Sequence, residues 1–297
     1  MLFNASRLLL WVSICTLMTR CRSFVCKSEI TVRPVRLFGN FVSRFEPYQS
    51  SFPNLTVDQL DQLDQLSSQI EAWNEKVNLI SRKDIDAIVP NHIVPSLSVS
   101  LVKSFESGQR IVDVGTGGGF PGLPMAIACP AASFTLLDSN TKKMKIVAEI
   151  AETLGLDNVN VVTCRAEEYD QKFDFIMGRA VSAVPKFLSF SSHFLNPDRC
   201  SGDDDDSRSA ETNVDVPRAT SGLLYLKGGD FTGELQEARI SRYSLSAVNQ
   251  LVPGLESDKS VLYVPTAEVT RFYTNMISAR LSESKNRSNK KGKNPKR

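Results

Sequence analysis

A strand-like run that ends in a glycine-rich turn most constrains how this chain can fold. Residues 112–122, VDVGTGGGFPG, pass from alternating apolar residues through a cluster of glycines into a helix-like segment. Glycines leave the backbone without Cβ atoms, so a ligand can lie against it, and the helix N-terminus offers free N–H groups. Asp138 ends the next strand-like run, where a carboxylate can hold ribose hydroxyls. Together these features predict a nucleotide cofactor at the carboxyl ends of two parallel strands.

From Arg110 onward, apolar runs of strand length alternate with amphipathic runs of helix length. We expect strands at 111–114, 134–138, 159–164, 173–178 and 223–226, with helices near 121–129, 142–154, 184–194 and 230–240. This alternation is typical of a parallel, doubly wound α/β sheet. Two further strand-like runs, YSLSAVNQLV and KSVLYVPT, flank a Pro/Gly/Asp loop at 253–258 and predict an antiparallel hairpin at the sheet edge.

Two kinds of nucleotide cofactor are compatible with this pattern. A dinucleotide for hydride transfer would use similar parts, but none of the six tyrosines has a lysine four residues later, and His193 falls inside a predicted helix. The terminal hairpin is instead typical of methyltransferases. S-adenosylmethionine is therefore the favoured cofactor.

Six short motifs, in order along residues 56–265, carry a resemblance to a known family. They are WNEKVNL at 73–79, DVGTGGGFPGLP at 113–124, LLDS at 136–139 followed by Lys142 and Lys143, RAEE at 165–168, GRAV at 178–181 and LKGG at 226–229. This set resembles the bacterial small-subunit ribosomal RNA guanine-N7 methyltransferases of the RsmG type, also called GidB. The resemblance implies a class I S-adenosylmethionine-dependent methyltransferase fold, Rossmann-like, with a helical N-terminal extension.

The resemblance also assigns roles to individual residues. It implies that Asp138 binds the ribose, that Ala166 and Glu167 bracket the adenine, and that Arg179 faces both the cofactor and the target base as the catalytic residue. The methionine end of the cofactor is assigned to the loop residues Gly115, Gly117, Gly119, Phe120 and Gly122.

The chemistry at the fourth predicted strand is consistent with an attack by guanine N7. N7 carries a lone pair and no proton, so methyl transfer to it requires alignment and no general base. Enzymes that methylate exocyclic amines or pyrimidine C5 carry Asn/Asp-Pro-Pro-aromatic or Pro-Cys runs, whereas this chain has MGRAV at 177–181. The resemblance implies that the target is a guanine in the 530-loop of small-subunit RNA, which we expect to be organellar. Two alternatives stay open: a non-catalytic RNA-binding or ribosome-assembly protein, and a methyltransferase that acts on protein or a small molecule.

Cations near the predicted strand and helix ends are candidate contacts with the RNA backbone. They are Arg82, Lys142, Lys143, Arg165 and Lys227, with Lys83 and Lys186 beside them. The chain departs from the family where Arg-His-x-x-Asp-Ser is usual, because it has Asn91 and Pro95 in place of the cation and the carboxylate. Gly118 replaces the usual Pro or Ala in the cofactor loop.

Other features of the composition limit the function further. The formal net charge is +2, so affinity for RNA must come from local patches or the basic C-terminus. Six cysteines without a Cys-x-x-Cys pair, and two histidines, predict neither a zinc site nor a disulfide framework. We expect no metal, no stable membrane association of the mature protein and a monomer.

The two ends and one internal segment are predicted to lie outside the catalytic fold. An apolar run at 8–18 followed by an Arg-rich stretch with few acids is typical of an organelle presequence, which we place at 1–36, with the plastid favoured and the mitochondrion as the alternative. A linker at 37–55 and a helical region at 56–108 precede the methyltransferase domain at 109–275. A disordered acidic insertion at 198–220 interrupts this domain, and a disordered basic tail at 276–297 follows it.

Overall fold

A computed structural model describes residues 44–196 and 219–291 of this protein, with side chains described as far as 284. The predicted presequence lies outside the described residues, and so does nearly all of the acidic insertion. No helix in the described ranges is both long and apolar enough to cross a bilayer.

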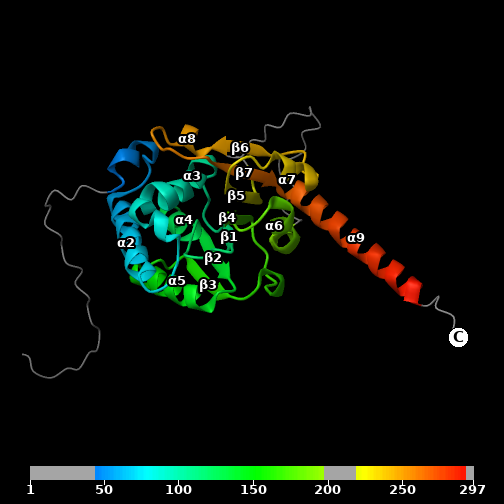
Figure 1. Ribbon diagram of the computed structural model, residues 1–297. Coiled ribbons are helices and arrows are strands. Elements are labelled where there is room, and N and C mark those ends of the chain that lie inside the picture. Colours follow the sequence, from blue (N-terminus) through cyan, green and yellow to red (C-terminus); the bar gives the residue numbers. More distant parts are fainter. Residues whose placement is uncertain (1–43, 197–218, 292–297) are drawn as a thin grey trace, which may run out of the picture. The chain divides into compact units, whose positions relative to one another are not determined.

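The described residues form a seven-stranded sheet with the order β3-β2-β1-β4-β5-β7-β6 (Figure 1). The strands are β1 Arg110–Val114, β2 Ser133–Asp138, β3 Val159–Thr163, β4 Phe175–Arg179, β5 Gly222–Gly228, β6 Ser244–Ala247 and β7 Lys259–Pro265. Strands β1 to β5 are parallel, whereas β7 runs antiparallel to both β5 and β6. The predicted doubly wound sheet with a terminal hairpin is confirmed. Its strand order reverses between β1 and β4, which is where such sheets bind ligands.

Helices cover both faces of the sheet, each over its own apolar cluster. One cluster joins the sheet to α2 Val57–Asn74, α3 Val94–Val102, α4 Gly122–Ala128 and α5 Thr141–Thr153. The other joins it to α6 Val184–Ser191, α7 Thr232–Glu237 and the start of α9 Thr266–Lys291. The inner strands are buried on both faces, in keeping with their nearly continuous apolar sequences, whereas the edge strands β3 and β6 are only partly buried.

The N-terminal helical region packs into the same core as the sheet. Helix α2 begins at a capping box formed by Thr56 and Gln59 and buries Leu63, Leu66 and Ile70. Between α2 and α3 lie η2 Arg82–Ala87 and η3 Val89–Ile93. The prediction of a linker at 37–55 is wrong over its second half. The segment Glu46–Ser51 is a 3-10 helix, η1, and the flanking Phe45 and Phe52 are buried in the core.

Two predictions near the C-terminus need correction. The run 243–252 is not one strand, because β6 ends at Ala247 and Val248–Leu251 forms α8, which turns Val248 into the core. The tail predicted to be disordered from residue 276 continues α9 to Lys291 (Figure 1). This stretch has no glycine or proline before Gly292 and Pro295, so nothing in the local sequence stops the helix sooner.

Candidate active site

The glycine-rich loop between β1 and α4 passes close to the ends of β2 and β4. Gly115 has a φ of 74° and donates its N–H to the carbonyl of Leu137 at 2.8 Å. A Cβ atom on Gly115 would lie 2.9 Å from Cγ2 of Val181, beyond the end of β4. Glycine is therefore required here both for the left-handed backbone and for the close approach to Val181.

Asp138, the last residue of β2, is tied to this loop. Its Oδ2 accepts the N–H of Gly117 at 2.9 Å, and its Oδ1 accepts the N–H of Asn140 at the same distance. Each carboxylate oxygen retains a further acceptor position. Asp138 also lines the neighbouring cavity, so these positions are available to the hydroxyls of a ligand.

This cavity has a volume of about 320 Å³ and lies at the carboxyl ends of the parallel strands. It brings together four of the predicted cofactor residues: Gly115, Asp138, Ala166 and Glu167. The last two belong to η4, Ala166–Glu168. The rest of the lining is Val114, Leu137, Ser139, Cys164, Arg165, Val181, Lys186 and Phe190.

The other predicted loop residues do not line this cavity but shape the loop around it. Gly117 positions Asp138, as described above. Gly119 has a φ of 91°, and a Cβ there would lie 2.4 Å from Cδ1 of Leu123. Phe120 is buried and packs its ring against Arg179 and His92.

Asp113 is a functional candidate that the sequence did not single out. It is fully buried in β1, where its Oδ2 accepts the hydroxyl of Thr116 at 2.6 Å and the N–H of Gly122 at 2.9 Å. A Cβ on Gly122 would lie 2.2 Å from Leu136 and 2.8 Å from Asp113 Oδ2, so this contact requires glycine. Oδ1 of Asp113 has no hydrogen-bond partner, and burial raises the pKa of this carboxyl to about 6. The signal in the sequence that could have identified Asp113 is its position two residues before Gly115, at the start of the glycine loop.

Arg179, the last residue of β4, is held between two ring systems. Its Nη2 lies 2.7 Å from Nδ1 of His92, and its guanidinium carbon lies 4.9 Å from the ring centroid of Phe120. Burial lowers the pKa of Arg179 to about 10, and the carboxylates of Asp113 and Asp84 partly offset this effect. The side chain therefore stays cationic at neutral pH.

His92 links Arg179 to Asp84. Burial, reinforced by the charge of Arg179, lowers the pKa of His92 to about 4, so the ring is neutral at pH 7. A guanidinium can only donate hydrogen bonds, so Nδ1 of His92 accepts from it. The proton then sits on Nε2, which lies 3.2 Å from Oδ2 of Asp84. The Nδ2 of Asn91 donates to the other oxygen of Asp84 at 3.3 Å. Asp84 and His92 were missed as site residues because η2 and η3 lie far from β4 in sequence.

These side chains border a second cavity of about 300 Å³. Its lining is Asp84, Asn91, His92, Arg179, Ala180, Leu226, Gly228 and Lys259. Ala180 has a φ of 50°, an uncommon and strained conformation for a residue with a Cβ atom. This turn separates Arg179, which lines the second cavity, from Val181, which lines the first.

The predicted RNA contacts fall into two groups. Arg82, Lys142 and Arg165 are exposed, and Nε of Arg82 donates to Oδ1 of Asn78 at 3.1 Å. Lys143 is half-buried, with its Nζ 3.4 Å from the carbonyl of Leu79.

Lys227 is bound to a carboxylate of its own chain. Its Nζ lies 2.7 and 2.9 Å from the two oxygens of Glu234 in α7. Glu234 Oε2 also accepts the N–H of Val184 at the start of α6, at 2.7 Å. Lys227 therefore holds α6 and α7 against β5, and its charge is already compensated.

The WNEKVNL motif and Gly118 meet at Leu79. Asn74 Oδ1 accepts the N–H groups of Leu79 and Ile80, at 2.8 and 3.0 Å, which fixes the loop after α2. A Cβ on Gly118 would lie 3.0 Å from the carbonyl oxygen of Leu79. Glycine at 118 thus lets the cofactor loop pack directly against the N-terminal region.

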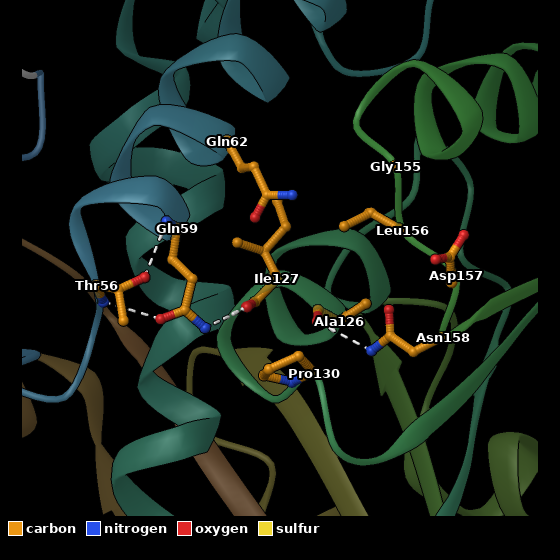
Figure 2. A pocket seen from close by; sticks show the side chains of 10 residues that line it. All are labelled: Thr56, Gln59, Gln62, Ala126, Ile127, Pro130, Gly155, Leu156, Asp157 and Asn158. Carbon is orange, nitrogen blue, oxygen red and sulfur yellow. Dashed lines mark hydrogen bonds between the residues drawn. The ribbon is translucent and has the colours of Figure 1, made fainter. Parts of the chain in front are cut away.

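A third cavity, of about 400 Å³, lies at the amino ends of the strands (Figure 2). Two of its polar side chains donate to carbonyls at the C-terminus of a helix. The amide of Gln59 donates to the carbonyl of Ile127 at 2.7 Å, and Asn158 donates to the carbonyl of Ala126 at 3.0 Å. These donors stabilise the C-terminus of α4. Among the described residues, no group of three His, Cys, Asp or Glu side chains is arranged to hold a metal ion.

Comparison with known proteins places these motifs in a family. The family model described as rRNA small subunit methyltransferase G (GidB) matches residues 59–200. The ribosomal RNA small subunit methyltransferase G of Christiangramia forsetii is 40% identical over 218 residues, which cover 72% of this chain and 93% of that protein. The protein of the same name from Flavobacterium psychrophilum is 39% identical over 215 residues, which cover 72% and 94%.

The chain belongs to this family. The resemblance inferred from the six motifs is thereby confirmed. The segment of this chain that matches the rRNA small subunit methyltransferase G family model, residues 59–200, contains the glycine loop, Asp138, Glu167 and Arg179. It also contains Asp84 and His92.

Proposed function

We propose that this chain transfers a methyl group from S-adenosylmethionine to N7 of a guanine in the 530-loop of small-subunit ribosomal RNA. The observation that supports this most directly is the cavity in which Gly115, Asp138, Ala166 and Glu167 meet, directly beside Arg179. Family membership supports the class of substrate.

The residues present fit S-adenosylmethionine. Gly115 and Val181 both line the cavity, and they lie so close together that a Cβ atom on residue 115 would clash with Val181. Asp138 offers free acceptor positions for ribose hydroxyls, and Ala166 and Glu167 line the same cavity. When bound, the sulfonium supplies an electrophilic methyl group.

The side chains near Arg179 suit a reaction that needs no general base. Guanine N7 has no proton to lose, and the neutral His92 is already committed to hydrogen bonds with Arg179 and Asp84. Arg179 provides a cationic donor that can hold an oxygen of the target base. Methyl transfer moves a positive charge from sulfur to the purine, and the carboxylates of Asp113 and Asp84 lie near enough to Arg179 to influence its pKa. They therefore keep the local field from becoming strongly positive.

The test is methyl transfer by the purified full chain to small ribosomal subunits that lack 7-methylguanosine. Chemical cleavage at 7-methylguanosine should give a new band in the 530-loop, and Arg179→Ala should remove most of it. A band at another position would contradict the choice of loop. Methylation of a ribosomal protein or of a small molecule, with no change in the RNA, would overturn the proposed substrate.

We also propose that the protein works in an organelle. The plastid is favoured, and the mitochondrion is the alternative. This rests on the apolar run at 8–18 and the Arg-rich, acid-poor stretch that follows it. A fluorescent protein fused behind residues 1–55 should enter plastids in a plastid-bearing cell, whereas a fusion that lacks residues 1–36 should stay outside. Retention of the first fusion in the cytosol or in the secretory pathway would contradict this location.

A further inference from the structure

The second cavity contains polar groups that have no part in holding the cofactor. Among the residues that line it, the sequence predicts a role only for Arg179. The polar side chains of Asp84, Asn91 and Lys259 also line the cavity and have no predicted role. Its volume of about 300 Å³ is at the lower end of the range for small-molecule pockets, which suits a single nucleobase. It adjoins the cofactor cavity at the Arg179–Ala180–Val181 turn.

Asp84 is held so that part of its carboxylate stays accessible. Each oxygen accepts one hydrogen bond, from His92 Nε2 at 3.2 Å and from Asn91 Nδ2 at 3.3 Å. The side chain is nevertheless 36% exposed. Each carboxylate oxygen has two acceptor positions, so one on each oxygen remains for a partner in the cavity. Two adjacent acceptors fixed in one plane match a ligand with two adjacent N–H donors.

Guanine has such a pair of donors, at N1 and at its 2-amino group. Adenine has an acceptor at N1, which would meet the carboxylate with like partial charge and leave a polar group unpaired. Guanine also has an acceptor at O6, next to N1, which an arginine can bind. Arg179 borders the same cavity as Asp84 and is joined to it through His92. The cavity therefore offers complementary groups to three neighbouring positions of guanine.

We infer that this second cavity receives the target guanine, and that Asp84 selects it by accepting hydrogen bonds from N1–H and the 2-amino group while Arg179 donates to O6. The inference rests on the proposed function and names a residue that determines specificity. N7 stays free of hydrogen bonds in this arrangement, as an atom that accepts a methyl group must. His92 and Asn91 are positioning residues, because they fix the carboxylate.

The experiment compares guanine with inosine, which lacks only the 2-amino group and keeps N7. Small subunits are reconstituted in vitro from ribosomal RNA with guanine or, by ligation of a synthetic segment, inosine at the target. With the parent protein, kcat/KM should be at least about tenfold higher for guanine, because a site built to bind a donor rejects the analogue that lacks it. Asp84→Asn should lower kcat/KM for guanine at least about tenfold and reduce the guanine-to-inosine ratio to about 3 or less.

Two further variants separate base selection from a general loss of structure. Asp86→Asn makes the same charge change in the same η2 segment, at an exposed residue outside the cavity, and should leave the ratio at its parent value. Asn91→Ala removes one hydrogen bond to Asp84 and should reduce the ratio partly. Calorimetry should give a Kd for S-adenosylmethionine within about twofold of the parent in all three, because none of these residues lines the cofactor cavity.

The outcomes distinguish this inference from the proposed function. A parent protein that methylates the guanine and inosine subunits equally well overturns the assignment of Asp84, although the methyltransferase activity stands. The same conclusion follows if Asp84→Asn keeps the full preference for guanine. If the parent methylates neither, the proposed function itself fails, and the assignment of Asp84 fails with it.

Discussion

The buried carboxyl of Asp113 should make the stability of this protein depend on pH in a way that one substitution removes. Its folded-state pKa of about 6 lies above the model value of 3.8, because burial disfavours the charged form. The folded state therefore holds a proton that the unfolded state releases between these two values. The contribution of Asp113 to the stability is therefore most favourable below pH 4 and falls as the pH rises through 6.

The size of the effect follows from the shift. A difference of about two pKa units corresponds to about 3 kcal/mol in total, at about 1.4 kcal/mol per unit. About half of this, roughly 1.5 kcal/mol, falls between pH 5 and pH 8. Asp113→Asn keeps an oxygen that can accept from Thr116 and Gly122 but removes the titration. Its amide N–H₂ group takes the place of Oδ1, which has no partner, so the variant also carries a cost of about 1–3 kcal/mol that does not change with pH.

Urea denaturation of the cofactor-free protein from pH 5 to pH 8, followed by circular dichroism, measures this effect. The free energy of unfolding of Asp113→Asn minus that of the parent should rise by about 1.5 kcal/mol across this range. Taking the difference cancels the titration of the other carboxylates, which both proteins share. Parallel curves for parent and variant would refute the argument, because they would mean that Asp113 is ionised in the folded state throughout.

Three further predictions concern the site directly. Arg179→Ala should lower single-turnover methyl transfer more than about tenfold with the circular dichroism spectrum unchanged, and near-normal turnover would exclude its role. Gly115→Ala and Gly229→Ala both place a Cβ at a φ of 74°, but only at Gly115 does it meet another atom within 4 Å. Gly229→Ala should cost roughly 1 kcal/mol in urea denaturation, and Gly115→Ala should cost at least as much because its Cβ also meets Val181. Only Gly115→Ala should weaken S-adenosylmethionine binding in calorimetry, by more than about tenfold; equal weakening by both variants would mean that strain alone is responsible. Lys142→Ala should reduce the slope of log Kd for RNA against log salt by about 1, whereas Lys227→Ala should leave the slope unchanged and lower stability; a reduced slope for Lys227→Ala would show that it contacts phosphate despite Glu234.

Most of the sheet could be predicted because its pattern is local. Each strand before the hairpin is a short apolar run next to a turn or helix signal, and the glycine loop marks the first strand end without ambiguity. The errors fall where tertiary packing overrides such signals. Val248 belongs to a helix instead of the expected strand, and its side chain is buried in the core. Phe45 and Phe52 are also buried in the core, although the composition of their segment suggested a linker.

The candidate site divides in the same way. Gly115 and Asp138 could be predicted because they follow neighbouring parallel strands, whose carboxyl ends meet at one edge of the sheet, whereas Ala166 and Glu167 were predicted from the family resemblance; the structure places all four on one cavity. The part of the site that contains Arg179 could not be completed from the sequence. Its partner His92 is 87 residues away and reaches it only because the N-terminal helices pack on the sheet.

The sequence by itself thus determined the class of fold, because this depends on strand periodicity and on glycines at fixed positions, and it indicated the family through six ordered motifs. Only the tertiary structure decided which charges are used within the protein and which are free. It pairs Lys227 with Glu234, leaves Asp113 without a full set of partners and connects Asp84 to Arg179 through His92. Charged side chains interact through space at a few ångströms, and nothing in local sequence records which distant residues packing will bring that close.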